Sequence, residues 1–584
     1  MRQGIRALFY TTSVAGLLLT ACPGDGAAQS NDDVWNPFKW LESAPSRRKP
    51  AADAENRADL DRVPSPPPRS GPVEAADLAP VEAPDGSGLP LDLWPGLSIG
   101  DIEQLLVTLD LPPRSPVLHQ LWQRMLLASA SAPDGAASED HFTALRLEAL
   151  YRSGLLDAMD EALGQRATAS PLAQVIHARK QIGIGAREEG CRTMGSLAAS
   201  GTALRGRLKS EAQLLAGYCA AAAGDAAATG LAANLAREEG VTDGIALHVL
   251  DSLGLGTKER PPLPARMTLL DYRFLTLLGP VNDAELIAKA EPALLVVLAR
   301  AETRDMRMKT AAAEAALRLN ALLPAEVAEV YGMASDAKGK APAGEPIDPV
   351  LRRARLFRAV NSTQAPDLKG QLLRALLDDA RRMGIYHQTA RMLVPVLVQL
   401  WPSPETAPLA EPIVEIGLSA GEYDLARRWA ETSGSLRHWL ALIDLADGQS
   451  RGGRLPSLAH AEELAARGKL NAEVLHRLST VIDALDMEVP MPIWEAAGRV
   501  PQPGSGYLPE TGVLSELQQA SQRKDVARTI LVAMRAIGPN AADGASILAL
   551  GDTIRALKRA GLEADARRFG VEALLSVWPR AGGH

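Results

Sequence analysis

From residue 92 onward, apolar residues recur along the chain at spacings of three and four, which is the period of one face of an α-helix. Segments 102–109, 119–128 and 143–152 show this pattern, with Leu, Val, Trp or Ala at the repeating positions. Short breaks marked by Gly or Pro separate such segments, as turns between helices do. No clear run of alternating β-branched residues indicates a strand. The pattern therefore predicts an all-α fold.

Several of these breaks share one shape, in which a helix ends near a Gly and the next helix begins with small residues. They lie around Gly154, Gly224, Gly384, Gly421 and Gly561. Segments 420–426 (AGEYDLA) and 560–566 (AGLEADA) resemble the turn of a tetratricopeptide repeat, where a small residue five positions after the Gly lies at the helix crossing. A strict 34-residue period is missing. The resemblance implies a degenerate helical-hairpin solenoid, and the alternative is a non-repetitive helical domain.

The amino-acid composition predicts two segments that separate or precede the helical regions. Residues 22–91 are rich in Pro, Asp, Ala and Ser and cannot bury a core, so they are predicted to be a disordered linker. A second low-complexity stretch, 335–349, is expected to separate an N-terminal array at 92–334 from a C-terminal array at 350–584, or to form one long loop between them.

The first 21 residues have the features of a bacterial export signal. A short basic start with Arg2 and Arg6 precedes residues 7–21, which are uncharged but too short to span a bilayer, a task that takes about 20 apolar residues. The sequence Leu-Thr-Ala-Cys that ends at Cys22 resembles the bacterial lipobox. That resemblance implies that Cys22 is acylated and becomes the new N-terminus. The alternative is an ordinary signal peptide cut near Ala28.

Two further resemblances bear on the predicted location of the protein in the cell. Pro23 stands where an Asp would retain a lipoprotein in the inner membrane of enteric bacteria, which implies an outer-membrane lipoprotein facing the periplasm, or alternatively a soluble periplasmic protein. Segments 93–97 (LWPGL), 111–116 (LPPRSP) and 126–128 (LLA) resemble a group of Ala-rich exported lipoproteins of alphaproteobacteria without an established activity.

One apolar stretch interrupts the predicted linker. Trp35, Phe38 and Trp40 lie close together in a segment that has no core to receive them. They are interpreted as anchors of a docking peptide for a protein groove. The alternatives are a stretch at the membrane interface, where Trp is favoured, and a segment that docks back on the protein's own helices.

The two remaining cysteines, Cys191 and Cys219, lie 28 residues apart, and their midpoint falls beside Gly201 and Gly206. If residues 189–200 and 208–223 are antiparallel helices, the two cysteines come to lie opposite each other. An exported protein folds in an oxidising compartment, so a disulfide is expected, worth about 3–4 kcal/mol in the chain-entropy model. Two free buried thiols are the alternative.

Few features of the sequence indicate nucleic-acid binding, metal binding or catalysis. The formal net charge of −8 and the pI near 5.7 argue against nucleic-acid binding. A zinc-binding His-Glu-x-x-His motif is missing, and the nine His are scattered. Gly-x-Ser-x-Gly occurs at 96–100 and 417–421, but a hydrolase elbow needs a preceding strand, which neither has. No catalytic residue, metal site or cofactor is therefore predicted.

These features favour a non-catalytic scaffold or adaptor that binds proteins of the cell envelope through a helical-repeat surface. The alternative is binding to cell-wall polymer, or a role as accessory to a peptidoglycan-acting enzyme. A deep pocket that holds a buried Glu with a raised pKa would favour this alternative. The sequence identifies neither the partner nor the oligomeric state.

Overall fold

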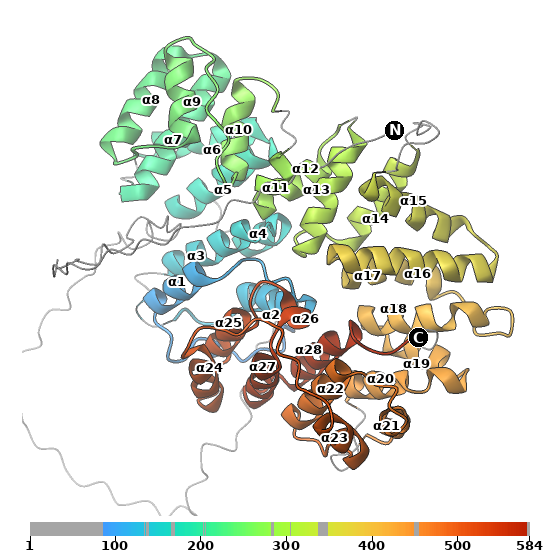
Figure 1. Ribbon diagram of the computed structural model, residues 1–584. Coiled ribbons are helices and arrows are strands. Elements are labelled where there is room, and N and C mark those ends of the chain that lie inside the picture. Colours follow the sequence, from blue (N-terminus) through green and yellow to red (C-terminus); the bar gives the residue numbers. More distant parts are fainter. Residues whose placement is uncertain are drawn as a thin grey trace, which may run out of the picture. The chain divides into compact units, whose positions relative to one another are not determined.

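The structure is a computed structural model that describes residues 86–580, except 134, 136–138, 165–169, 202–203, 205, 282–284, 304, 337–347 and 449–454. These residues all belong to one of the chain's two compact units, residues 38–584. Within them the chain forms 28 α-helices and no extended strand (Figure 1). Only the isolated bridges Met267–Ala290 and Tyr507–Ala545 pair extended backbone in this part of the chain. The predicted all-α fold is confirmed.

The helices fall on the two sides of the low-complexity stretch 335–349. Those before it are α1 (Ile99–Thr108), α2 (Pro116–Leu127), α3 (Glu139–Arg152), α4 (Leu156–Leu163), α5 (Pro171–Ile184), α6 (Arg187–Ala199), α7 (Gly206–Ala223), α8 (Ala226–Glu238), α9 (Ile245–Gly254), α10 (Leu269–Leu277), α11 (Leu286–Lys289), α12 (Pro292–Arg300), α13 (Met306–Arg318) and α14 (Pro324–Asp336). Those after it are α15 (Pro349–Ser362), α16 (Pro366–Met383), α17 (Tyr386–Leu397), α18 (Ala410–Ala420), α19 (Tyr423–Ala430), α20 (Trp439–Asp447), α21 (Leu458–Ala466), α22 (Ala472–Ala484), α23 (Met491–Gly498), α24 (Val513–Gln522), α25 (Val526–Ile537), α26 (Ala541–Gly544), α27 (Ile547–Arg559) and α28 (Glu563–Leu575). The short 3₁₀ helices η4 (Ala407–Leu409) and η5 (Gly434–Leu436) flank α18 and α19.

The turn between α18 and α19 shows why the Gly-marked breaks form. Gly421 ends α18 with a left-handed φ of 86°, a conformation that suits Gly because it has no Cβ. The next residue, Glu422, donates its backbone N–H to the carbonyl of Gly417 at 2.8 Å. A Cβ at Gly417 would lie 3.2 Å from the Cβ of Ala426, so this crossing requires two small residues. The predicted turn is therefore present, with the small residue at the expected position.

Helices adjacent in sequence also pack against one another on either side of the other four predicted breaks. The pairs are α3–α4, α7–α8, α16–α17 and α27–α28. The local hairpins thus agree with the sequence pattern. A solenoid of repeats stays a prediction.

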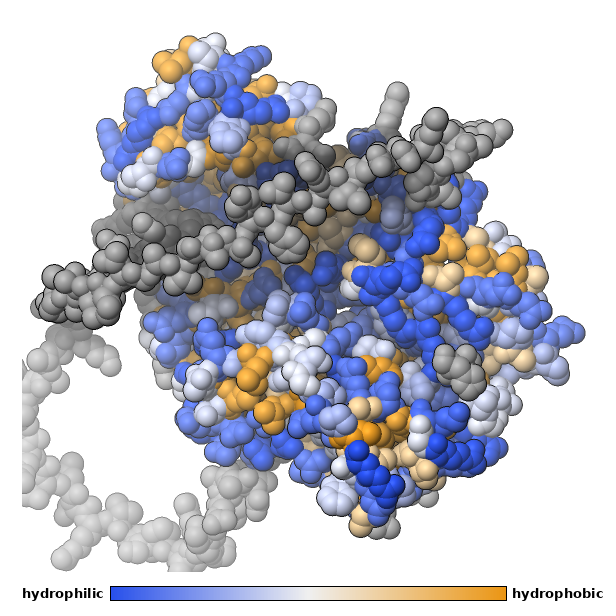
Figure 2. Space-filling model, in the orientation of Figure 1, coloured by the Kyte–Doolittle hydropathy of each residue, from blue (hydrophilic) through white to orange (hydrophobic). Residues whose placement is uncertain are grey.

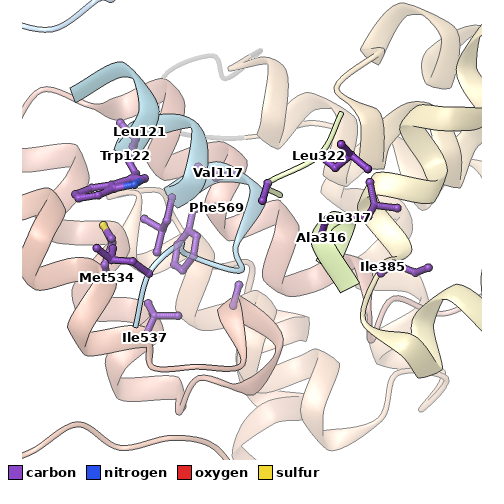
Figure 3. Close-up of a cluster of buried hydrophobic side chains, with 14 of the residues drawn as sticks. Val117, Leu121, Trp122, Ala316, Leu317, Leu322, Ile385, Met534, Ile537 and Phe569 are labelled. Atoms are coloured by element: carbon purple, nitrogen blue, oxygen red, sulfur yellow. The ribbon is translucent and has the colours of Figure 1, made fainter. Parts of the chain in front are cut away.

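The first helices pack against the last ones. Helix α2 contacts α25 and α28, and α1 contacts α25. Figure 3 shows Val117 of α2 beside Phe569 of α28, with both side chains buried. An ion pair between Arg124 and Asp565 adds a polar contact of 2.6 Å at the edge of this core. We call these contacts of α1 and α2 with α25 and α28 the junction.

The predicted boundaries can be compared with this packing. Helices α14 and α15, which flank residues 337–347, pack against each other. The two predicted arrays are thus in contact there as well as at the junction. The side chains of Leu89 and Leu93 are fully buried, so the packed chain includes Leu89, ahead of the boundary expected at residue 92.

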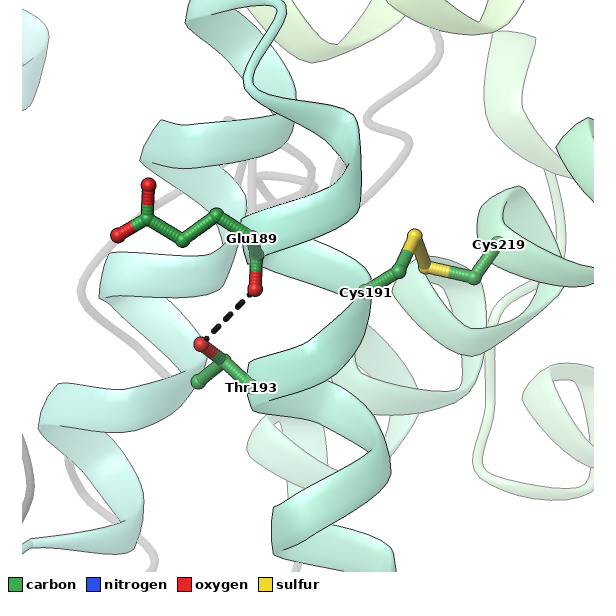
Figure 4. Close-up of a disulfide and its surroundings, with 4 residues drawn as sticks. All are labelled: Glu189, Cys191, Thr193 and Cys219. Carbon is green, nitrogen blue, oxygen red and sulfur yellow. Dashed lines mark hydrogen bonds between the residues drawn. A yellow bond between two sulfur atoms is a disulfide. The ribbon is translucent and has the colours of Figure 1, made fainter.

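The cysteine pair lies in the hairpin of α6 and α7, as predicted (Figure 4). A disulfide joins Cys191 of α6 to Cys219 of α7, and their Cα atoms are 5.6 Å apart. Both side chains are half-buried against the core. No helix in the described part of the chain is long and apolar enough to cross a membrane.

Candidate functional site

A carboxyl group of the last helix lies at the centre of the junction. Glu572 of α28 accepts hydrogen bonds on Oε2 from the hydroxyl of Ser115, at 2.9 Å, and from the backbone N–H of Val117, at 3.2 Å. Ser115 is also the N-cap of α2, where its Oγ accepts the N–H of Leu118. Burial raises the pKa of Glu572 to about 8, although the bonds from Ser115 and Val117 oppose this shift.

Two hollows meet around this carboxyl group. Their cavity volumes are about 360 Å³ and 260 Å³, and Pro116, His387 and Glu572 belong to the walls of both. Figure 2 shows an opening bordered mainly by hydrophilic residues near the centre of the view, where α17 and α28 approach each other in Figure 1. The smaller hollow lies between the segment before α2, the end of α13, the start of α17 and residues 540–543. The larger one lies between α2, α17, the turn after α18, and α28.

Three arginines in these walls have no acidic partner among the described residues. Arg114 precedes α2 and Arg318 ends α13, and both line the smaller hollow; Arg391 of α17 lines the larger one. The Nε of Arg114 is buried without a hydrogen-bond partner in the described part of the chain. Burial lowers the pKa of Arg318, and the charge of Arg114 lowers it further. We call the two hollows with these three arginines the arginine cavity.

Arg381, Arg568 and Asp447, which also lie in these walls, are paired with groups of opposite charge. Arg381 binds Glu415, which also accepts hydrogen bonds from Tyr386 at 2.8 Å and Arg580 at 3.0 Å. Arg568 donates to Asp565 at 2.9 Å, and the exposed Asp447 lies 3.4 Å from Arg427.

Two histidines beside Arg391 are held neutral. Burial, and then the charges of Arg391 and Arg381, lower the pKa of His387 to about 3. Burial and the charge of Arg391 lower the pKa of His119 to about 4. His387 Nδ1 lies 2.8 Å from the hydroxyl of Ser419, the central residue of the second Gly-x-Ser-x-Gly match. A base this weak cannot take up the proton of a serine at neutral pH, so this pair lacks the properties of a nucleophile and its base.

The Gly-x-Ser-x-Gly matches have ordinary structural surroundings. Ser98 is the N-cap of α1 and forms a capping box with Asp101. Ser419 lies near the end of α18, in the helix rather than after a strand. The structure therefore agrees with the expectation that neither serine lies on a hydrolase elbow.

A third hollow lies away from the junction, and we call it the loop groove. Its volume is about 580 Å³, and its walls come from α16, residues 402–407, the start of α18, the end of α19 and η5. Trp429 is fully buried in its wall, and its indole N–H has no acceptor among the described residues. Next to the groove in sequence, the side chain of Trp401 is 67% exposed and lies against the guanidinium of Arg428.

The predicted site residues that the structure describes lie outside the walls of these hollows, and the others fall outside the described residues. Cys22, Trp35, Phe38 and Trp40 lie outside the described residues. The cysteines of the disulfide lie in α6 and α7, which line neither the arginine cavity nor the loop groove. Among the described residues, no group of three or more His, Cys, Asp or Glu is arranged to hold a metal ion.

Sequence reasoning missed the residues of the arginine cavity. Arg114, Arg391 and Glu572 are far apart in the chain and form no motif, so only the tertiary fold brings them together. A scan against protein-family models and searches of curated proteins and of solved structures found no match. Function is therefore inferred from the residues and their geometry.

Proposed function

We propose that the protein is a non-catalytic adaptor of the bacterial cell envelope that binds segments of partner proteins through its stacked helical hairpins. The observation that carries the proposal is the loop groove, the largest of the hollows described above. A surface built from many helix ends and loops suits an extended segment because it offers successive pockets along one path.

The chemistry of the loop groove favours a peptide. Pro402 and Pro404 provide rigid apolar contacts, and the exposed ring of Trp401 is a suitable anchor for an apolar side chain. We therefore propose that the partner inserts an extended segment with at least one apolar side chain.

In this proposal, the N-terminal segment determines where in the cell envelope the protein lies. Acylation at Cys22 would hold the protein on the periplasmic face of the outer membrane. A linker of the predicted length has a root-mean-square reach of roughly 45 Å, so the helical part would work away from the lipid surface.

Proximity labelling in living cells, with the full-length chain, tests the proposal. We expect a discrete set of envelope proteins to be labelled, and we expect Ala407→Arg, which fills the loop groove from an exposed position, to abolish their labelling. Trp401→Ala should weaken it. The matched control is Trp494→Ala, which removes an equally exposed Trp, 63% accessible, on α23.

Two results would contradict the proposal. If the Ala407→Arg protein labels the same proteins as the wild type, the loop groove is not the binding surface. If Cys22→Ala leaves both the labelled set and the membrane association unchanged, lipid anchoring at Cys22 is wrong.

A second candidate is binding to cell-wall polymer, and Glu572 is the observation that favours it. It is a buried carboxyl group with a raised pKa in the wall of a cavity. Its Oε2 already accepts two hydrogen bonds within the protein, so we propose binding rather than catalysis. Co-sedimentation of the full-length protein with purified sacculi tests this candidate, and its failure at physiological salt would exclude it.

A further inference from the structure

Two arginines of the arginine cavity, Arg114 and Arg391, depart from the way this protein treats its other guanidinium groups that are shielded from solvent, while the third, Arg318, is exposed. Arg353 is almost fully buried, and its Nε donates to Glu314 at 2.8 Å. Arg179 is also buried, and it binds both Glu148 and Glu211. An unpaired buried cation is costly, so buried arginines are normally matched with carboxylates. Arg114 and Arg391 are half-buried without such a match.

The acidic groups in the walls of the cavity form no ion pair with these three arginines. Burial keeps Glu572 protonated at neutral pH. Asp543 lies in the wall of the smaller hollow but forms no salt bridge with Arg114, Arg318 or Arg391, and Asp447 in the wall of the larger one lies 3.4 Å from Arg427. His119 and His387 contribute no charge, and Arg568 and Arg381 are engaged with their own carboxylates. Three guanidinium groups therefore border the two hollows without an ion-pair partner among the described residues.

The three groups also reach the hollows from separate elements. Arg318 lies over the turn between α16 and α17, where its Nε would be 3.4 Å from a Cβ at Gly384. Arg114 comes from the segment before α2, and Arg391 from the second turn of α17. Guanidinium groups that line connected hollows from different elements can bind several oxygen atoms of one phosphate or carboxylate ligand, because each guanidinium donates paired hydrogen bonds to such groups.

We propose that the arginine cavity is a binding site for a small ligand that carries phosphate or carboxylate groups, held by Arg114, Arg318 and Arg391. The volumes of about 260 Å³ and 360 Å³ are near the lower end of the range for small-molecule pockets. This site is separate from the loop groove and does not depend on lipid at Cys22.

Such a ligand would connect the two ends of the fold. Its oxygens would contact Arg114 next to α2 and Arg391 of α17, while Glu572 of α28 lies in the walls of both hollows. A ligand that binds only the folded protein raises its unfolding temperature. Binding at this site is therefore expected to stabilise the junction.

Thermal unfolding and titration calorimetry of the full-length protein at pH 7 test the proposal. Sodium phosphate and sodium citrate are the probes, and sodium chloride at equal ionic strength controls for general salt effects. We expect a saturable rise in melting temperature with at least one probe. Phosphate alone would indicate a phosphorylated ligand, and citrate alone a polycarboxylate.

Substitutions of the cavity arginines test whether the probes bind in the arginine cavity. Arg391→Gln and Arg114→Gln should each weaken binding at least tenfold, and without a probe each should melt at or above the wild-type temperature, because each removes an unpaired charge. The matched control is Arg499→Gln, at the end of α23, where an exposed arginine pairs with Glu495. It should bind like the wild type.

Three results would overturn the proposal. One is a response to both probes no larger than that to sodium chloride. Another is unchanged affinity in both the Arg391→Gln and Arg114→Gln proteins. The third is a large drop in the melting temperature of both variants without a probe, which would show that the arginines serve folding instead.

Discussion

The junction and the hairpin of α6 and α7 are stabilised in opposite ways. The junction buries large side chains, among them Trp122 and Phe569, and surrounds them with polar contacts between residues more than 400 positions apart. The α6–α7 hairpin is rich in Ala and Gly and joins neighbouring helices through one covalent bond. Small side chains bury little apolar area, so a hairpin made of them gains more from a cross-link. The comparison predicts different sensitivities for the two regions.

The largest effect is expected from Phe569→Ala. Phe569 is fully buried beside Val117 (Figure 3), so the substitution leaves a cavity that the surrounding helices cannot fill. The free energy of unfolding should fall by about 3–5 kcal/mol. Urea unfolding followed by circular dichroism measures this loss. A loss below 1 kcal/mol would contradict a shared core at the junction.

A slightly smaller effect is expected from the disulfide. Replacing both Cys191 and Cys219 by Ala should lower the free energy of unfolding by about 3 kcal/mol, because the unfolded chain then loses its cross-link. Dithiothreitol should destabilise the wild type by a similar amount and leave the double variant unchanged. Equal sensitivity of both proteins to dithiothreitol would show that no disulfide forms.

The pH dependence of the junction is the third test. Glu572 stays protonated in the folded protein up to about pH 8, whereas in the unfolded chain it ionises near pH 4.5. Unfolding therefore releases a proton between these values, and the contribution of Glu572 to stability falls as the pH rises from 4.5 to 8. Relative to Glu572→Gln, the wild type should lose about 2–3 kcal/mol by pH 7.

The difference in stability between the wild type and Glu572→Gln reports on Glu572 alone, because His119 and His387 titrate alike in both proteins. Their lowered pKa values make the folded protein gain stability as the pH rises toward 6.5, opposite in sign to the effect of Glu572. Parallel melting-temperature curves for wild type and Glu572→Gln between pH 5 and 8 would show that Glu572 is ionised in the folded protein.

The smallest effect is expected at the edge of the junction. Arg124→Gln removes the ion pair with Asp565 but leaves that carboxylate bound to Arg568, so the free energy of unfolding should fall by only about 1 kcal/mol. Raising the salt concentration should reduce this difference, because Arg124 is partly exposed. A loss as large as that of Phe569→Ala would mean that polar contacts dominate the junction.

Sequence reasoning found the features that depend on neighbours in the chain. The turn at Gly421 and the pairing of Cys191 with Cys219 follow from helical period and from a turn at the midpoint between the two cysteines. The junction could not be found in this way. Ser115 is an ordinary helix N-cap and Glu572 an ordinary helical residue, and the bond between them depends on how all the helices between α2 and α28 pack.

The arginine cavity was missed for a related reason. An arginine on a predicted helix is normally assigned to a solvated face, and only the three-dimensional structure reveals which arginines lack a carboxylate. Arg353 and Arg391 look alike in the sequence, yet one is paired with Glu314 and the other is not.

The junction also determines when α2 can be buried during synthesis of the chain. Val117 and Trp122 leave the ribosome more than 400 residues before Phe569 and Glu572 are made. The apolar surface of α2 therefore stays uncovered until α28 has been made. A polypeptide that stops before α28 would leave α2 without the residues that bury it, and such a product would be a natural target for chaperones and proteases.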